Sequence, residues 1–155
     1  MKKGVRISLI VQEGTLKSTF PGCLVERTRE EQLVWIHTLS PTPISATYRV
    51  LLIYQLTKGV KVFVKDPTLK LAEGKLTLPH VYSTPLQRLC LYYPGFREWD
   101  TGMLYTRTII PWASEWLFHY ESWVVTGNWH GGGIDHDAEG QAKIELRTEI
   151  HDESC

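Results

Sequence analysis

The sequence predicts an α+β fold in which a four-stranded antiparallel meander packs against helices. Two observations carry this prediction. Apolar residues recur with period two along 33–39, 47–56 and 60–65, and the short connections between these segments favour neighbouring antiparallel strands. After residue 108 the apolar spacing changes to three and four, which indicates one long amphipathic helix. The 155 residues, 43% hydrophobic and 22% charged, have the size and composition of one globular domain.

The first segment, from Ile7 to Phe20, is predicted to be a short helix anchored by Leu9 and Leu16. Gly14 weakens this prediction because glycine lowers helix stability. Apolar residues also occupy every second position from 5 to 11, so a short strand is the competing interpretation. A Pro-Gly pair ends the segment in both cases.

Three strands follow, and turn residues separate them. Ser40–Pro43 stops the first strand, and Lys58-Gly59 forms a tight turn between the second and the third. A short fourth strand around Leu76–Leu78 is expected to complete the meander. The side chains expected in the core follow the strand and helix periods; they are Trp35, Leu51, Ile53, Val62, Val64, Trp116 and Trp123.

The long helix has an end signal on each side. Thr108 is the expected N-cap and Gly127 the expected C-cap. A His-Gly-Gly-Gly run at 130–133 comes soon after the helix, and the chain beyond it is polar. We therefore expect one domain, residues 1–133, and a polar tail, residues 134–155, that forms an edge element or is disordered.

Charge and cysteine content exclude several classes of protein. Seventeen Lys and Arg against seventeen Asp and Glu give a formal charge of zero, so no long-range field favours nucleic acid or an anionic membrane as a partner. No apolar run is long enough for a membrane span or a secretory signal. Cys23, Cys90 and Cys155 are odd in number and far apart, which argues against a disulfide framework and a structural zinc site. We expect a cytoplasmic protein without a cofactor, and the sequence leaves its oligomeric state open.

The segment 79–100 is predicted to be mostly irregular coil, and it contains the candidate chemistry. Long ordered coils inside a compact domain are often functional. Cys90 lies between two leucines, ten residues after His80. A thiolate is a strong nucleophile even near the free cysteine pKa of about 8.5, so a cysteine exposed here can attack an activated carboxyl. The competing interpretation is a buried structural thiol.

This layout resembles that of ubiquitin-conjugating enzymes. Their signature is a His-Pro-Asn triplet, seven further residues, an active-site Cys between apolar residues, and then a Trp. His80, Leu89-Cys90-Leu91 and Trp99 match these elements, and the order of helix, meander, coil and helix matches as well. Val81-Tyr82 depart from the pattern, since the family has Pro-Asn there.

Within that family the chain most resembles the compact bacterial members encoded with cyclic-oligonucleotide-based antiphage signalling systems (CBASS). The likeness covers about residues 7–133. The segments that carry it are Phe20-Pro21-Gly22, Trp35 to Pro41, Pro79 to Tyr82, Leu89 to Tyr92, Thr108 to Leu117, Tyr120-Glu121 and Trp123.

The resemblance implies that Cys90 carries the C-terminal carboxyl of a protein as a thioester and passes it to an amine. In the family the histidine, here His80, mainly braces the loop, and we expect that role in preference to acid–base catalysis. The family Asn supports the oxyanion, and Tyr82 is the candidate donor in its place. The carried protein is then a cGAS-like nucleotidyltransferase that presents its C-terminal tail, in bacterial antiphage defence. The chain has no nucleotide-binding motif, so the carboxyl is activated by an adenylating partner or by another route.

Two hypotheses from other classes compete with this one. The first is a catalytically silent binding module on the same fold, which the missing Asn favours and the retained Cys90 disfavours. The second is a metal-dependent hydrolase that uses His130 and His136. The glycine run between these histidines gives no fixed ligand geometry, so we expect no metal site. Cys23 has no histidine partner and is expected to be structural, and the terminal Cys155 to be dispensable.

Overall fold

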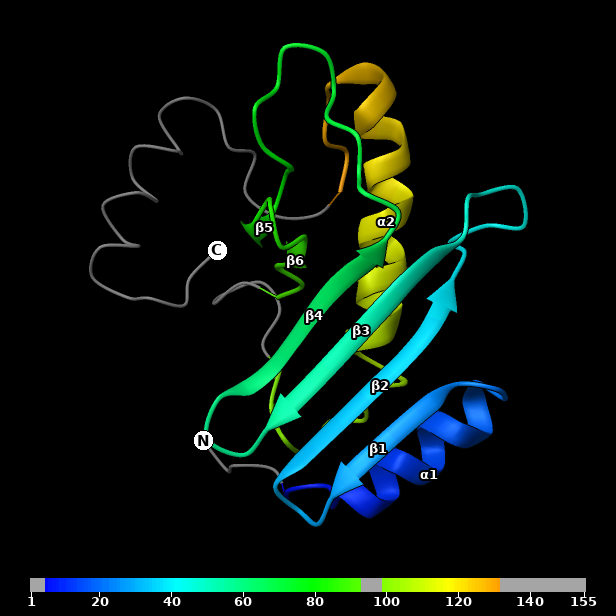
Figure 1. Ribbon diagram of the computed structural model, residues 1–155, viewed down its shortest axis with the longest axis vertical. Helices are drawn as coiled ribbons and strands as arrows, with labels where there is room; N and C mark the ends of the chain where they lie inside the picture. Colours follow the sequence, from blue (N-terminus) through cyan, green and yellow to red (C-terminus); the bar gives the residue numbers. More distant parts are fainter. Residues whose placement is uncertain (1–4, 93–98, 132–155) are drawn as a thin grey trace.

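Two helices and one six-stranded sheet make up the part of the chain that the computed structural model describes, residues 5–92 and 99–131 (Figure 1). The helices are Leu9–Thr19 (α1) and Ile109–Thr126 (α2). The strands are Leu24–Thr28 (β1), Gln32–Leu39 (β2), Tyr48–Gln55 (β3), Gly59–Asp66 (β4), Val81–Ser83 (β5) and Arg88–Leu89 (β6). Their order in the sheet is β1-β2-β3-β4-β6-β5, and every pair is antiparallel. Both helices lie behind the sheet in Figure 1, α1 behind β1 and α2 behind β3 and β4.

The predicted α+β fold with an antiparallel meander is confirmed, and the structure corrects the number of strands. The meander is β1 to β4, and its first strand, Leu24–Thr28, was not predicted. Residues 76–78 form no strand, although one was expected there. Instead β6 and β5 extend the sheet at the edge of β4, inside the segment predicted to be mostly coil. These strands are too short for alternation to reveal them.

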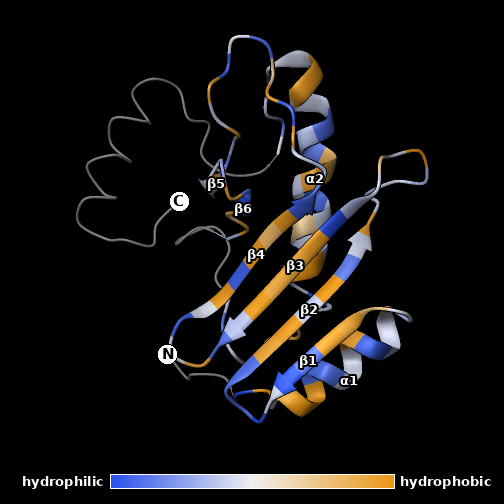
Figure 2. Ribbon diagram, viewed as in Figure 1, coloured by the Kyte–Doolittle hydropathy of each residue, from blue (hydrophilic) through white to orange (hydrophobic). Residues whose placement is uncertain are grey.

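One face of the meander is the core. Its central row joins Trp35 of β2, Leu52 of β3 and Val62 of β4, which lie opposite one another across the strands. All three are almost fully buried. Figure 2 shows the hydrophobic residues concentrated on these strands and along α2. Burying each such side chain stabilises the fold by roughly 1.5–3 kcal/mol, so this row is a large part of the stability.

Five of the seven residues expected in the core are buried. The prediction was wrong about which residues of β3 face the core. Val50, Leu52 and Tyr54 face the core, whereas Leu51 and Ile53 are only partly buried on the other face. Residues 50–54 are all apolar, so alternation within β3 cannot show which parity points inward. The pairing of Leu52 with the buried Trp35 decides it.

The first segment is a helix, as predicted, and a distant carboxylate caps it. Ser8 at the N-cap makes no side-chain capping hydrogen bond. Glu30, from the turn between β1 and β2, accepts hydrogen bonds from the backbone N–H groups of Leu9 (2.6 Å) and Ile10 (3.3 Å). A carboxylate at this end also suits the helix dipole. The helix therefore depends on a contact that local sequence does not show.

The predicted ends of α2 are confirmed in position. Thr108 is the N-cap residue, but its hydroxyl donates to the Leu104 carbonyl (2.8 Å) and not to the first turn. Gly127 ends the helix in the left-handed conformation with φ 76°, where a residue with a side chain would be strained. Its N–H donates to the Trp123 carbonyl at 2.7 Å.

Two buried glutamines join segments that are distant in the sequence. Gln12 of α1 donates to the Met103 carbonyl (2.9 Å) and accepts from the Tyr105 N–H (3.0 Å). Gln87 donates to the carbonyls of Val64 (2.9 Å) and Pro67 (3.1 Å) and accepts from the Leu69 N–H (2.5 Å). Sequence analysis singled out neither residue. Gln87 directly precedes β6, so its amide holds the start of the segment that carries Cys90.

A carboxylate on α2 ties the helix to the sheet. Glu121 accepts hydrogen bonds from the Ser45 hydroxyl (2.5 Å), the Ala46 N–H (3.3 Å) and the Tyr48 hydroxyl (3.0 Å). Burial, and secondly this bond to Glu121, raise the pKa of Tyr48 well above its usual range. Burial likewise raises the pKa of Tyr105 and Tyr120.

We expect Gln87→Met to lower the free energy of unfolding by about 3 kcal/mol, because it leaves buried backbone groups without their partner. The measurement is urea unfolding of the pure protein. Gln55→Met is the matched control, since among the described residues the Gln55 side chain has one long hydrogen bond, 3.5 Å to Gln32. Equal losses in the two variants would contradict the structural role given to Gln87.

We also expect the protein to lose stability above about pH 10, the pKa of an unperturbed tyrosine. The raised pKa means that the folded state keeps the phenol proton of Tyr48 while the unfolded state loses it. The unfolded state then binds fewer protons, so stability is full below that pH and falls as the pH rises. Unfolding free energies at pH 8 and at about pH 11 test this, and Tyr48→Phe should flatten the fall. A stability that does not change over this range would contradict the expectation.

Candidate active site

Cys90 lies at the sheet edge that β5 and β6 form. Arg88 of β6 is paired with Phe63 of β4, and Leu89 with Val81 of β5. The Cys90 N–H donates to the His80 carbonyl at 3.0 Å, which continues the β5–β6 pairing by one step. The backbone of the cysteine is therefore fixed although it stands outside a strand. Its side chain is 9% exposed, and its Sγ lies 3.4 Å from the Tyr92 carbonyl oxygen.

His80 braces this backbone through its carbonyl. The same oxygen that accepts from Cys90 also accepts from the indole N–H of Trp116 at 3.1 Å, which joins the coil to α2. His80 has φ 47°, in the left-handed region that non-glycine residues seldom adopt. The main-chain oxygen of His80 thus joins the Cys90 segment to α2.

Aromatic rings pack on the outer side of this brace. The Trp129 ring lies 5.0 Å from the His80 ring, 5.7 Å from Trp116 and 5.6 Å from His119, measured between centroids. Trp116 stacks in turn on Tyr120 at 5.6 Å. Sequence analysis did not single out Trp129, because it lies after the helix and outside any periodic pattern.

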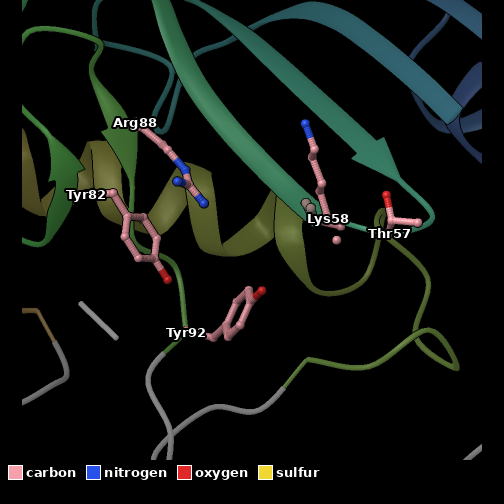
Figure 3. A pocket seen from close by; sticks show the side chains of 7 residues that line it. Thr57, Lys58, Tyr82, Arg88 and Tyr92 are labelled. Atoms are coloured by element: carbon pink, nitrogen blue, oxygen red, sulfur yellow. The ribbon is translucent and has the colours of Figure 1, made fainter. Parts of the chain in front are cut away.

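Tyr82 takes part in a basic pocket beside the cysteine segment. The Arg88 guanidinium carbon lies 4.2 Å from the centroid of the Tyr82 ring, a cation–π contact. Tyr82, Arg88 and Tyr92 line one side of a pocket of about 320 Å³, and Lys58 from the β3–β4 turn lines the other (Figure 3). The residues proposed from sequence thus lie on paired segments: Cys90 follows β6, and His80 and Tyr82 belong to the segment paired with it.

Cys23 is a free cysteine whose Sγ donates to the Leu16 carbonyl at 3.7 Å. Only the reduced form of Cys90 can act as a nucleophile.

Trp99 and the candidate metal ligands were also singled out from the sequence. Trp99, matched to the family Trp, packs on Tyr105 at 5.8 Å. Among residues 5–92 and 99–131, no three His, Cys, Asp or Glu side chains are grouped so that they could hold a metal ion. His136 and Cys155 lie outside these ranges, as does the expected tail, 134–155.

The sequence matches the model of the type II CBASS E2 protein family over residues 12–137. The chain belongs to this family. The match covers most of α1, the whole sheet, the Cys90 segment and α2, so it agrees with the E2-like arrangement of helix, meander, cysteine segment and helix. No curated protein matches the sequence significantly. In the described part of this CBASS E2 protein, neither helix is long and apolar enough to cross a membrane.

We expect Gly131→Ala to displace Trp129 from His80. A Cβ at Gly131 would lie 2.6 and 2.8 Å from indole atoms of Trp129 and 3.0 Å from the His119 ring. Such distances force a ring to move. Tryptophan fluorescence should change and the melting temperature should fall. Gly14→Ala is the control, because no atom lies within 4 Å of its Cβ and alanine favours the helix. If both variants resemble the parent protein, the packing of Trp129 on this brace is wrong.

Proposed function

We propose that this CBASS E2 protein is a cysteine acyltransferase of the ubiquitin-conjugating type. Cys90 accepts the C-terminal carboxyl of a partner protein as a thioester and passes it to an amine, in the cytoplasm of a bacterium that defends itself against phage. The observation that carries the proposal is the backbone clamp at His80, which holds the N–H of a cysteine at the edge of a rigid sheet. A fixed nucleophile lowers the entropy cost of attack.

The reaction has two acyl-transfer steps. In the first, the Cys90 thiolate attacks the carbonyl carbon of an activated carboxyl; a C–S bond forms and the activating group leaves with its electron pair. In the second, an amine attacks the thioester carbonyl; a C–N bond forms, the thiolate leaves, and the amine loses a proton. The thioester conserves the free energy of activation between the two steps. Both steps require Cys90 in its reduced form, because the thiolate is the nucleophile and the leaving group.

Tyr82 is the proposed oxyanion donor in place of the family Asn. Each step passes through a tetrahedral intermediate with a negatively charged oxygen, which a positioned donor stabilises. The hydroxyl of Tyr82 is such a donor, and the cation–π contact with Arg88 fixes its ring. His80 acts as a positioning residue through its carbonyl.

The proposed carried protein is a cGAS-like nucleotidyltransferase, which presents its C-terminal tail to Cys90. An adenylating partner, where one is present, supplies the activated carboxyl. A binding module on the same fold is the second candidate. The low exposure of Cys90 and the replacement of the family Asn favour it.

We expect reduced protein, co-expressed with its nucleotidyltransferase and any adenylating partner, to form a covalent adduct that hydroxylamine or thiol cleaves. Cys90→Ser should form a slower adduct that resists thiols, because serine is hardly ionised near neutral pH and gives an ester. Cys90→Ala should form none. Non-reducing electrophoresis and mass spectrometry measure the adduct.

The matched control is Cys23→Ala, which removes the free cysteine next to α1 and should keep the adduct. Phage protection by Cys90→Ala at the level of the parent protein would overturn the acyltransferase proposal and favour the binding module.

A further inference from the structure

The pocket that Arg88 and Tyr92 line carries positive charge. Among the described residues, its lining includes Lys58 and Arg88, together with the phenols of Tyr82 and Tyr92, and no Asp or Glu. Figure 3 shows Tyr82, Arg88 and Tyr92 gathered on one side and Lys58 on the other. Its volume of about 320 Å³ is within the range of small-ligand sites, roughly 300–1,000 Å³. The whole chain is electrically neutral, so this charge is local.

Arg88 is held against an aromatic ring, and one of its donors has no acceptor in the described part of the chain. Its guanidinium lies on the Tyr82 ring, yet its Nε is buried and meets no hydrogen-bond acceptor among the described residues. Neither Arg88 nor Lys58 forms an ion pair within that part of the chain. Buried donors in proteins nearly always have partners. An arginine ordered against a ring, with no ion pair among the described residues and beside a pocket lined by two phenols, therefore indicates a site for an oxyanion at the guanidinium.

The pocket and the sulfur are parts of one segment. Arg88 lies two residues before Cys90 and Tyr92 two residues after it, and the Tyr92 carbonyl oxygen is 3.4 Å from Sγ. A ligand held by Arg88 and Tyr92 is therefore held by the residues on either side of Cys90 in the chain. This links the pocket to recognition of the acyl donor.

We propose that the pocket binds an Asp or Glu side chain in the C-terminal segment of the protein that Cys90 carries. This inference rests on the proposed function. The substrate that reaches Cys90 is then a polypeptide, and the oxyanions that a polypeptide brings with it are carboxylates. The guanidinium of Arg88 donates to the carboxylate, the Tyr92 hydroxyl adds a donor, and Lys58 contributes charge from the opposite wall. The pocket thereby selects tails with an acidic residue a few positions before the terminus.

The test uses synthetic peptide thioesters, which need no activating enzyme. Each peptide is a Gly-Ser chain with one Glu placed two to six residues before the acyl terminus, paired with a Gln peptide of the same sequence. Mass spectrometry follows acyl transfer to Cys90 in reduced protein. We expect Glu at one or two of these positions to accelerate loading roughly tenfold over Gln, as a charge-assisted hydrogen bond can. Equal loading of Glu and Gln peptides at every position would overturn the inference.

Single substitutions test whether the pocket causes the faster loading of Glu peptides. Arg88→Gln should abolish the advantage of Glu, and Lys58→Gln, in an exposed turn, should reduce it. The matched control is Arg49→Gln, an exposed arginine of β3 outside the pocket, which should keep the full advantage. An advantage that survives in Arg88→Gln and in Lys58→Gln would place the preference elsewhere and overturn the inference.

A binding measurement separates this inference from the proposed function. Cys90→Ala protein is titrated with fluorescent, unreactive peptides of the same Glu and Gln pairs. Tighter binding of Glu peptides that requires Arg88 supports the pocket even if no thioester ever forms, in which case the acyltransferase proposal alone fails. A thioester without any preference for Glu, in loading or in binding, means that the pocket proposal alone fails. Inorganic phosphate is added as a competitor; saturable binding of phosphate with no preference for Glu would identify a phosphate site and overturn the carboxylate assignment.

Discussion

The candidate site depends on one backbone oxygen, the carbonyl of His80. It accepts a hydrogen bond from the Cys90 N–H and another from the Trp116 indole, and so joins the edge of the sheet to α2. A carbonyl has two lone pairs, and here each has a donor from a different element. The left-handed conformation of His80 aims the oxygen at both, and surrounding contacts must offset the cost of that conformation.

Those contacts come from two directions. Gln87 ties the residue before β6 to the chain that follows β4, while Trp129 packs on the His80 ring from outside. A short irregular segment is thereby held by a buried amide and an aromatic ring, with little regular hydrogen bonding of its own. Such an arrangement fixes the backbone of the residue proposed as the nucleophile.

Val81-Tyr82 stand where the family has Pro-Asn, and this replacement puts an aromatic ring in the segment paired with Cys90. Tyr82 brings a flat ring against which Arg88 is ordered, and this contact helps to form the basic pocket. The proposed oxyanion donor and the cation proposed to bind a substrate carboxylate are therefore in direct contact. Recognition and catalysis in this CBASS E2 protein would share one edge of the sheet.

The sequence by itself determined the fold class, three strands of the meander, both helices and the segment that carries the cysteine. These follow from local properties: the period of the apolar residues, the turn at Lys58-Gly59, the glycine at the end of α2, and a His–Cys spacing typical of the family. Such signals depend on residues close together in the chain, so they can be read without the fold.

Tertiary structure decided the rest. All five residues from 50 to 54 are apolar, so the sequence does not show which of them point into the core. The pairing of β3 with Trp35 on β2 decides this. The short strands β5 and β6 exist through pairing with β4 and with each other. The basic pocket unites a hairpin turn with residues some thirty positions further along. Each of these features is a contact between segments distant in the sequence, and its free energy appears only when the fold brings them together.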